Sequence, residues 1–213
     1  MEPHGGQPVV SAGAPLAPGQ SVVIAVHGRN ATPHSILALV PALGRPAITF
    51  LAPAAAGGSW YPYSFMAETS TNEPGLSSAL QTLGDLVDRV VASGVEQRRI
   101  VLLGFSQGAC LSAEFAVRHA ARFGGVILFS GGLIGPPGTS WLYPGSFDGT
   151  PIFLGCSNVD AHIPKTRVDE SAAVFQHMGA AVTKRIYPGM GHLVNDEEIL
   201  AAQALLDGLP RSS

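Results

Sequence analysis

Short apolar segments alternate with segments of helical period along most of this 213-residue chain. Strand-like apolar runs of about five to seven residues occur at residues 21–26, 47–51, 99–105, 125–129, 151–155 and 181–187. The clearest helix ends before Gly94, and its apolar residues recur at steps of three and four: Leu76, Leu80, Leu83, Val87 and Val90. Buried strands separated by helices predict a mostly parallel sheet covered by helices on both faces. We therefore expect an α/β fold.

The connections between the strands indicate where function should lie. Further helices are expected at residues 33–43, 107–122, 166–178 and 196–206, so nearly every strand is followed by a helix. Right-handed crossovers then bring the carboxyl ends of the strands to one edge, where functional residues collect. Residues 1–20 are rich in Gly, Pro and Ala and are expected to form a lead-in that could hold one edge strand at residues 8–11. Residues 21–213 are expected to form a single domain.

Composition excludes several classes of function. The chain is 46% hydrophobic and 13% charged, with a net charge of −3, so it lacks the basic footprint of a nucleic-acid-binding protein. It has neither an apolar run long enough to span a membrane nor the pattern of a signal peptide. Cys110 and Cys156 suit small core residues and have no metal-ligand spacing. We expect a cytoplasmic protein without a cofactor or bound metal, and leave open whether it forms a homodimer.

One strand leads into a candidate nucleophile. The run of residues 100–111 places Gly104, Ser106 and Gly108 in a Gly-x-Ser-x-Gly pentad between an apolar strand and a helix. A sharp strand-to-helix turn of this kind exposes the serine hydroxyl at the helix N-terminus. The alternative is an ordinary strand-to-helix turn, but the strand before the pentad and the helix after it favour a nucleophile elbow.

A serine hydroxyl needs a general base, normally a histidine that a carboxylate orients. In this fold class the chain order is serine, then acid, then histidine. Asp160 follows the strand at residues 151–155, and His192 follows the strand at residues 181–187, so both fall at the same edge as Ser106. The other histidines lie in the lead-in, on helices, before the serine or after the wrong strand: His4, His34, His119, His177, His27 and His162. The alternative acids lie before their strand or at helix starts: Asp148, Asp169 and Asp196.

Attack by the serine also requires hydrogen-bond donors for the negative charge that develops on the carbonyl oxygen. One expected donor is the backbone N–H of Gln107, directly after the nucleophile. The other is the backbone N–H of Arg29, because Gly28 lets the loop after the first long strand turn toward the site. A simple turn that ends the strand is the alternative interpretation of His27 and Gly28.

These motifs together resemble a known family. The motifs Val26-His27-Gly28, Gly104-Phe-Ser106-Gln107-Gly108-Ala, Asp160 before Ile163-Pro164, and Gly191-His192 are similar to the carboxylesterase/phospholipase group of α/β-hydrolases, which includes acyl-protein thioesterases. The resemblance implies a compact α/β-hydrolase without a large lid domain, which hydrolyses esters or thioesters without a cofactor. It also implies Ser106, Asp160 and His192 as the triad, and Arg29 and Gln107 as the oxyanion hole.

The chain departs from the thioesterase pattern near the site. Arg29, Asn30 and Ala31 replace an apolar residue, Gly and Asp, and His162 replaces an apolar residue beside the acid. An aromatic loop at residues 60–65 is more like the bacterial small-substrate branch, whose members are carboxylesterases or dienelactone-hydrolase-like proteins. We expect Trp60, Tyr61 and His162 to line a pocket for a small acyl or aromatic group, although the aromatic residues could instead pin a surface loop. Arg29 could attract an anionic substrate or brace this loop.

The sequence therefore predicts a serine carboxylesterase that acts on a small-molecule ester. An acyl-thioesterase or lysophospholipase activity is the alternative from the same triad. A non-catalytic ligand-binding module is a further alternative from a different class of function, and so is acyl transfer to an acceptor other than water.

Overall fold

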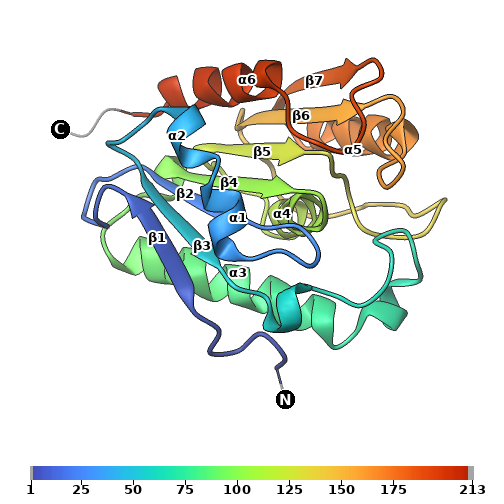
Figure 1. Cartoon of the computed structure of the whole chain (residues 1–213), viewed down its shortest axis with the longest axis horizontal. Coiled ribbons are helices and arrows are strands. Elements are labelled where there is room, and N and C mark those ends of the chain that lie inside the picture. The colour runs from blue at the N-terminus through green and yellow to red at the C-terminus, as the bar shows by residue number, and fades with distance from the viewer. Residues whose placement is uncertain (1, 211–213) are drawn as a thin grey trace.

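The computed structural model describes residues 2–210, in which seven strands form one sheet (Figure 1). Their order across the sheet is β1-β3-β2-β4-β5-β6-β7. The strands are β1 (Val9–Gly13), β2 (Val22–Val26), β3 (Thr49–Pro53), β4 (Ile100–Phe105), β5 (Gly125–Phe129), β6 (Pro151–Ser157) and β7 (Ala181–Tyr187). β1 pairs antiparallel with β3 at one edge, and every other pair in the described sheet is parallel. The predicted α/β fold is confirmed. Met1 of the expected lead-in and residues 211–213 of the expected domain lie outside the described residues.

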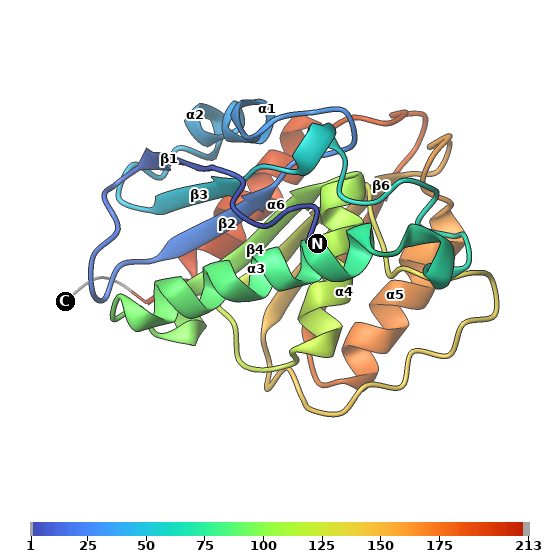
Figure 2. The same cartoon turned by 90° about the horizontal axis from the view of Figure 1, so that it is seen from below.

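Helices cover both faces of the sheet. They are α1 (Pro33–Leu37), α2 (Val40–Leu43), α3 (Gly75–Ala92), α4 (Gln107–Arg118), α5 (Lys165–His177) and α6 (Asp196–Asp207). Two separate hydrophobic clusters show the layering: α3, α4 and α5 pack on one face of the sheet, and α1, α2 and α6 pack on the other. Figure 2 shows α1 and α2 above the sheet and α3, α4 and α5 below it.

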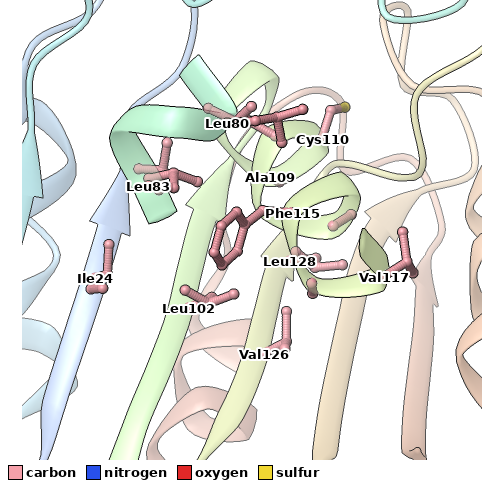
Figure 3. Packing of buried hydrophobic residues seen from close by; sticks show 14 of the residues in the cluster. Ile24, Leu80, Leu83, Leu102, Ala109, Cys110, Phe115, Val117, Val126 and Leu128 are labelled. Atoms are coloured by element: carbon pink, nitrogen blue, oxygen red, sulfur yellow. The ribbon is translucent and has the colours of Figure 1, made fainter. Parts of the chain in front are cut away.

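The larger cluster lies between the central strands and the helices α3 and α4 (Figure 3). Phe115 of α4 lies at its centre and is 2% exposed. Around it lie side chains from α3 and three strands: Ile24, Leu80, Leu83, Leu102, Val126 and Leu128. Burial of each large apolar side chain contributes about 1.5–3 kcal/mol. Since β2, β4 and β5 are apolar throughout and buried on both faces, this packing fixes α4 against the middle of the sheet.

In the N-terminal half of the chain, the structure differs from the predicted bounds of one helix and one strand. The helix expected at residues 33–43 is broken into α1 and α2, because Pro41 has no N–H to donate to the carbonyl of Leu37 and its ring would clash with that carbonyl. The strand expected at residues 47–51 corresponds to β3 (Thr49–Pro53), which begins and ends two residues later and so includes Pro53. Pro53 is tolerated there because it ends the strand and pairs only with Val9 of the edge strand.

The turn from β4 into α4 is the tightest point of the fold. Ser106 has φ 55° and ψ −122°, a left-handed backbone conformation that is rare for a residue with a side chain. A Cβ on Gly104 would lie within 3.0 Å of the backbone of Gly108 and Ala109, and a Cβ on Gly108 would lie within 3.0 Å of the backbone oxygen of Val26. Both glycines of the pentad are therefore required by contacts with backbone atoms, which cannot move aside as a side chain can.

We expect Gly108→Ala to lower the free energy of unfolding by about 3 kcal/mol or more, because its methyl group would overlap the carbonyl groups of Val26 and His27. Gly84→Ala is the matched control. Gly84 lies inside α3, and an added Cβ would meet Phe115 at an ordinary 3.7 Å. Alanine should there leave stability unchanged or raise it by up to about 1 kcal/mol. Urea unfolding monitored by circular dichroism measures the stability of the two variants. Equal stability would contradict the expectation.

Candidate active site

Three polar side chains from separate elements form one hydrogen-bonded series at the carboxyl edge of the sheet. Ser106 follows β4, Asp160 follows β6 and His192 follows β7. The Ser106 Oγ lies 2.8 Å from His192 Nε2, and the His192 Nδ1 lies 2.7 Å from Asp160 Oδ2. A carboxylate only accepts, so the Nδ1–H of His192 donates to Asp160 and Nε2 is left to accept from the serine hydroxyl. The structure thus brings together the three residues that the sequence predicts as nucleophile, base and acid.

Asp160 is held in one orientation. Its side chain is fully buried, and its Oδ1 accepts the backbone N–H groups of His162 at 2.8 Å and Ile163 at 3.0 Å. Burial by itself would raise the pKa of this carboxyl. The hydrogen bonds from His192 and from the two backbone N–H groups outweigh burial and lower the pKa below its ordinary value. Asp160 therefore stays ionised and fixes the tautomer of His192.

The loop that carries His192 is fastened to the loop after β6. The N–H of Gly189 donates to Asn158 Oδ1 at 2.8 Å, and the N–H of Gly191 donates to Ser157 Oγ at 3.1 Å. The imidazole itself lies between two rings: Phe105, with centroids 5.0 Å apart, and His162, 4.8 Å apart. Sequence reasoning did not assign a role to Phe105, although its position directly before the nucleophile was a usable signal.

A second carboxyl group lies beneath the same loop. Glu198 of α6 is fully buried and forms a capping box with Asn195: the N–H of Glu198 donates to Asn195 Oδ1, and the N–H of Asn195 donates to Glu198 Oε2. The Glu198 carboxyl occupies the space above Gly155 of β6, where any side chain would clash with it. Burial, together with the nearby negative charge of Asp160, raises the pKa of Glu198 to about 7, although the hydrogen bond from the Asn195 N–H acts to lower it. The sequence indicated a helix cap at Asn195 and Asp196, but the role of Glu198 in this Asn195-x-x-Glu198 capping box was not predicted.

The loop after β2 approaches the nucleophile from the other side. A Cβ on Gly28 would lie 3.4 Å from the Cβ of Ser106, so this backbone is in van der Waals contact with the elbow. In the part of the chain that the structure describes, the backbone N–H of Arg29 donates to no other residue. The N–H of Gln107 belongs to the first turn of α4, where helix geometry leaves it without an intrahelical partner. Both predicted oxyanion donors thus lie beside Ser106.

Buried polar groups fasten the aromatic loop to this site. The N–H of Ala55 donates to His27 Nε2 at 3.2 Å, so Nδ1 carries the ring proton and donates to the Gly28 carbonyl at 2.8 Å. Burial lowers the pKa of His27, which favours this neutral ring. The side chain of Gln107 accepts the N–H of Trp60 at 2.9 Å and donates to the carbonyl of Tyr61 at 2.8 Å.

His4 reaches the same loop from the N-terminal segment. The N–H of Ala56 donates to its Nδ1 at 3.0 Å, and its Nε2–H donates to the Trp60 carbonyl at 2.8 Å. His4 is 3% exposed, so the lead-in is packed here against the aromatic loop. This contact joins residues 56 positions apart, and no local pattern in the sequence indicates it.

A pocket of about 840 Å³ opens over Ser106. Tyr61 and His162, two of the three residues predicted to form it, are in its wall. Trp60 is not: its side chain is fully buried, and its Nε1–H donates to the His27 carbonyl at 2.9 Å. The prediction for Trp60 was therefore wrong: the indole turns inward, where its apolar surface is buried and its N–H has an acceptor. The apolar part of the wall includes Ile36, Leu39, Tyr63, Phe65, Phe105 and Val194.

Other reactive groups in the described chain do not compete with Ser106. Burial raises the pKa of both Cys110 and Cys156 to about 12, so they are protonated at neutral pH. No group of three or more His, Cys, Asp or Glu side chains in residues 2–210 is placed to hold a metal ion. None of the helices in that range has the length and apolar character needed to cross a bilayer.

Comparison with known proteins agrees with this architecture. A family model described as Phospholipase/Carboxylesterase matches residues 7–208. The chain belongs to the phospholipase/carboxylesterase family. The crystal structure of a phospholipase/carboxylesterase from Dyadobacter fermentans DSM 18053 superposes on it with a TM-score of 0.91 and 39% identity, covering 97% of this chain and 98% of that one. The Bacillus cereus carboxylesterase shares the fold, with a TM-score of 0.78 and 17% identity over 95% of this chain and 94% of that one.

Other relatives match this chain over a smaller part of their length. Acyl-protein thioesterase 1 from Eremothecium gossypii is 29% identical over 148 residues, which cover 67% of this chain and 61% of that protein. A probable carboxylesterase SOBER1-like protein from Arabidopsis thaliana is 25% identical over 143 residues, which cover 67% of this chain and 54% of that protein. The matched segment therefore spans about three fifths or less of the length of these two relatives.

The buried Glu198 predicts a specific pH dependence of stability. A glutamate ionises near 4.5 in the unfolded chain and near 7 in the folded protein, so the folded state binds more protons between these values. Stability should fall as pH rises through this window, by up to about 3 kcal/mol. Glu198→Gln keeps the capping box but cannot ionise. The melting temperature of the variant should equal that of the parent near pH 5 and should exceed it near pH 8.

Thermal unfolding of both proteins across pH 5–8 measures this difference. Glu197→Gln is a suitable control, since Glu197 is the exposed neighbour on the same helical turn. Parallel pH curves for the parent and the Glu198 variant would show that Glu198 ionises normally.

Proposed function

We propose that this protein is a serine carboxylesterase in which Ser106, His192 and Asp160 act as nucleophile, base and acid. The observation that carries the proposal is the unbroken hydrogen-bonded series from Ser106 Oγ through His192 to a buried carboxylate. It lies at the floor of a pocket open to a small molecule. Membership of the phospholipase/carboxylesterase family supports the same reaction.

The reaction follows from this arrangement. Ser106 Oγ attacks the acyl carbon while His192 Nε2 takes its proton, and Asp160 stabilises the resulting imidazolium. The carbonyl oxygen becomes an oxyanion that accepts from the backbone N–H groups of Arg29 and Gln107. His192 then protonates the departing alkoxide, which leaves as the alcohol. Water attacks the acyl-enzyme with His192 as base, and the acid is released while Ser106 regains its proton.

The pocket wall favours esters with small acyl or aromatic groups. Tyr61, Tyr63, Phe65 and Phe105 provide apolar ring surface beside the nucleophile. Aromatic walls of this kind bind flat or compact apolar groups by burying their surface.

A thioesterase is the second candidate, because acyl-protein thioesterase 1 is among the relatives. The same triad attacks a thioester carbonyl, so the distinction lies in the leaving group. Comparison of kcat/KM for an oxygen ester and a thioester with the same acyl group separates the two. Inclusion of an added alcohol in the assay shows whether the acyl group passes to an acceptor other than water.

Ser106→Ala should reduce kcat for a short-chain p-nitrophenyl ester about 10⁶-fold, since the acyl-enzyme can no longer form. Ser93→Ala, at the carboxyl end of α3, is the control, because its hydroxyl bonds only locally to Val90. Circular dichroism should show that both variants are folded. Turnover of the Ser106 variant near that of the parent would rule out the proposed nucleophile.

Asp160→Asn should lower kcat about 10⁴-fold, because the amide favours the wrong tautomer of His192. Covalent labelling gives an independent measurement that needs no knowledge of the substrate. A fluorophosphonate should attach to Ser106 alone in the parent protein, as mapped by peptide mass spectrometry. A label on another residue would contradict Ser106 as the nucleophile, whereas an unreactive protein with a folded pocket would indicate a non-catalytic binding module.

A further inference from the structure

The pocket over Ser106 contains a fixed positive charge and no negative one. Arg29 is the one lysine or arginine in its wall, and the described wall includes no aspartate or glutamate. Asp160 lies close by, but its side chain is fully buried and bonded to His192 and to backbone N–H groups. The net charge of the chain is −3, so a positive pocket does not follow from overall composition.

The guanidinium of Arg29 is held at the rim of the pocket. It donates to the carbonyl of Pro62 at 2.7 Å and to the carbonyl of Tyr63. Its Cζ lies 5.9 Å from the ring centroid of Tyr61, which limits its orientation further. A guanidinium carries five N–H donors, so two carbonyl partners leave three for another ligand.

The charge of Arg29 is not neutralised by its partners. Both partners are uncharged carbonyl groups, and no carboxylate in the described chain lies within 4.0 Å of it. Other arginines with a fixed head group do pair with carboxylates, as Arg118 does with Glu114 and Arg167 with Glu170. A cation that is oriented, unpaired and exposed in a pocket is suited to bind an anionic group by charge-assisted hydrogen bonds.

We propose that Arg29 determines specificity by binding an anionic group on the substrate. The preferred substrates are then esters that carry a carboxylate or a similar compact anion near the ester bond. The backbone of the preceding residue, Gly28, contacts Ser106, and the guanidinium of Arg29 bonds to the carbonyl of Tyr63. The distance between the bound anion and the reacting carbonyl would therefore be about the length of one arginine side chain. This inference rests on the proposed function.

Loop bracing is the competing role for Arg29, and the two roles have different kinetic effects. Loss of a brace alters the pocket for every substrate, so the rates for a charged ester and its neutral analogue should change by the same factor. Loss of an anion site lowers only the rate for the charged ester. The ratio of kcat/KM between matched charged and neutral esters therefore separates the two.

Two matched pairs place the anion on either side of the ester. Mono-p-nitrophenyl adipate and p-nitrophenyl hexanoate differ on the acyl side, and 4-acetoxybenzoate and 4-acetoxybenzamide differ on the alcohol side. In at least one pair, the parent protein should favour the charged ester roughly tenfold. The pair that shows the preference identifies the side on which the anion binds. The preference should weaken at high ionic strength, because the site is exposed to solvent.

Three variants complete the test. Arg29→Gln should remove most of that preference, and Arg29→Lys should retain part of it because it keeps the charge. Arg122→Gln makes the same change in net charge at an exposed arginine outside the pocket, and should leave the ratio as in the parent.

The possible failures are distinguishable. If the neutral esters are hydrolysed but neither pair shows a charge preference, or if Arg29→Gln changes both members of a pair equally, the anion site is overturned and the esterase is not. If none of the four esters is hydrolysed and Ser106 resists the fluorophosphonate, the proposed function fails and this inference fails with it.

Discussion

The approach of the first turn of α4 to the carboxyl end of β2 is the contact on which the rest of the site depends. Gly108 lies so close to the carbonyl groups of Val26 and His27 that a side chain has no room there. Ser106, two residues before this contact, has a positive φ, and the loop after β2 lies beside it. The strain at Ser106 persists because the buried packing of α4 against the central strands opposes any relaxation. One backbone contact thus sets the positions of both the candidate nucleophile and the candidate oxyanion donors.

Asp160, His192 and the aromatic residues of the pocket are on loops, and each loop is fixed by hydrogen bonds to side chains from other parts of the chain. The loop that carries His192 is tied to Ser157 and Asn158, and it continues into the capping box of Glu198. The aromatic loop is tied to His4, His27 and Gln107. Such bonds hold side chains in place before a ligand arrives, which lowers the reorganisation needed for reaction. This arrangement also has a cost, because Glu198 is buried and no lysine or arginine of residues 2–210 forms an ion pair with it.

Arg29 connects the two halves of the pocket. Its backbone lies on the oxyanion loop, and its side chain bonds to the carbonyl groups of the aromatic loop. The same residue can therefore position the wall, offer a backbone donor and present a positive charge. These roles involve different atoms, which is why esters that differ only in charge can separate them.

The order and spacing of strands, helices and glycines in the sequence were enough to predict the α/β fold, and they also predicted which residues would meet at one sheet edge. Parallel strands have their carboxyl ends together, so residues after β4, β6 and β7 had to lie at one edge of the sheet. The break between α1 and α2, the inward orientation of Trp60 and the burial of His4 and Glu198 were decided only by tertiary structure. Each depends on partners distant in the chain, such as the His27 carbonyl for Trp60 and the bare backbone of Gly155 for Glu198. Local periodicity carries information about which face of an element is apolar, but not about which buried polar atom will find a distant partner.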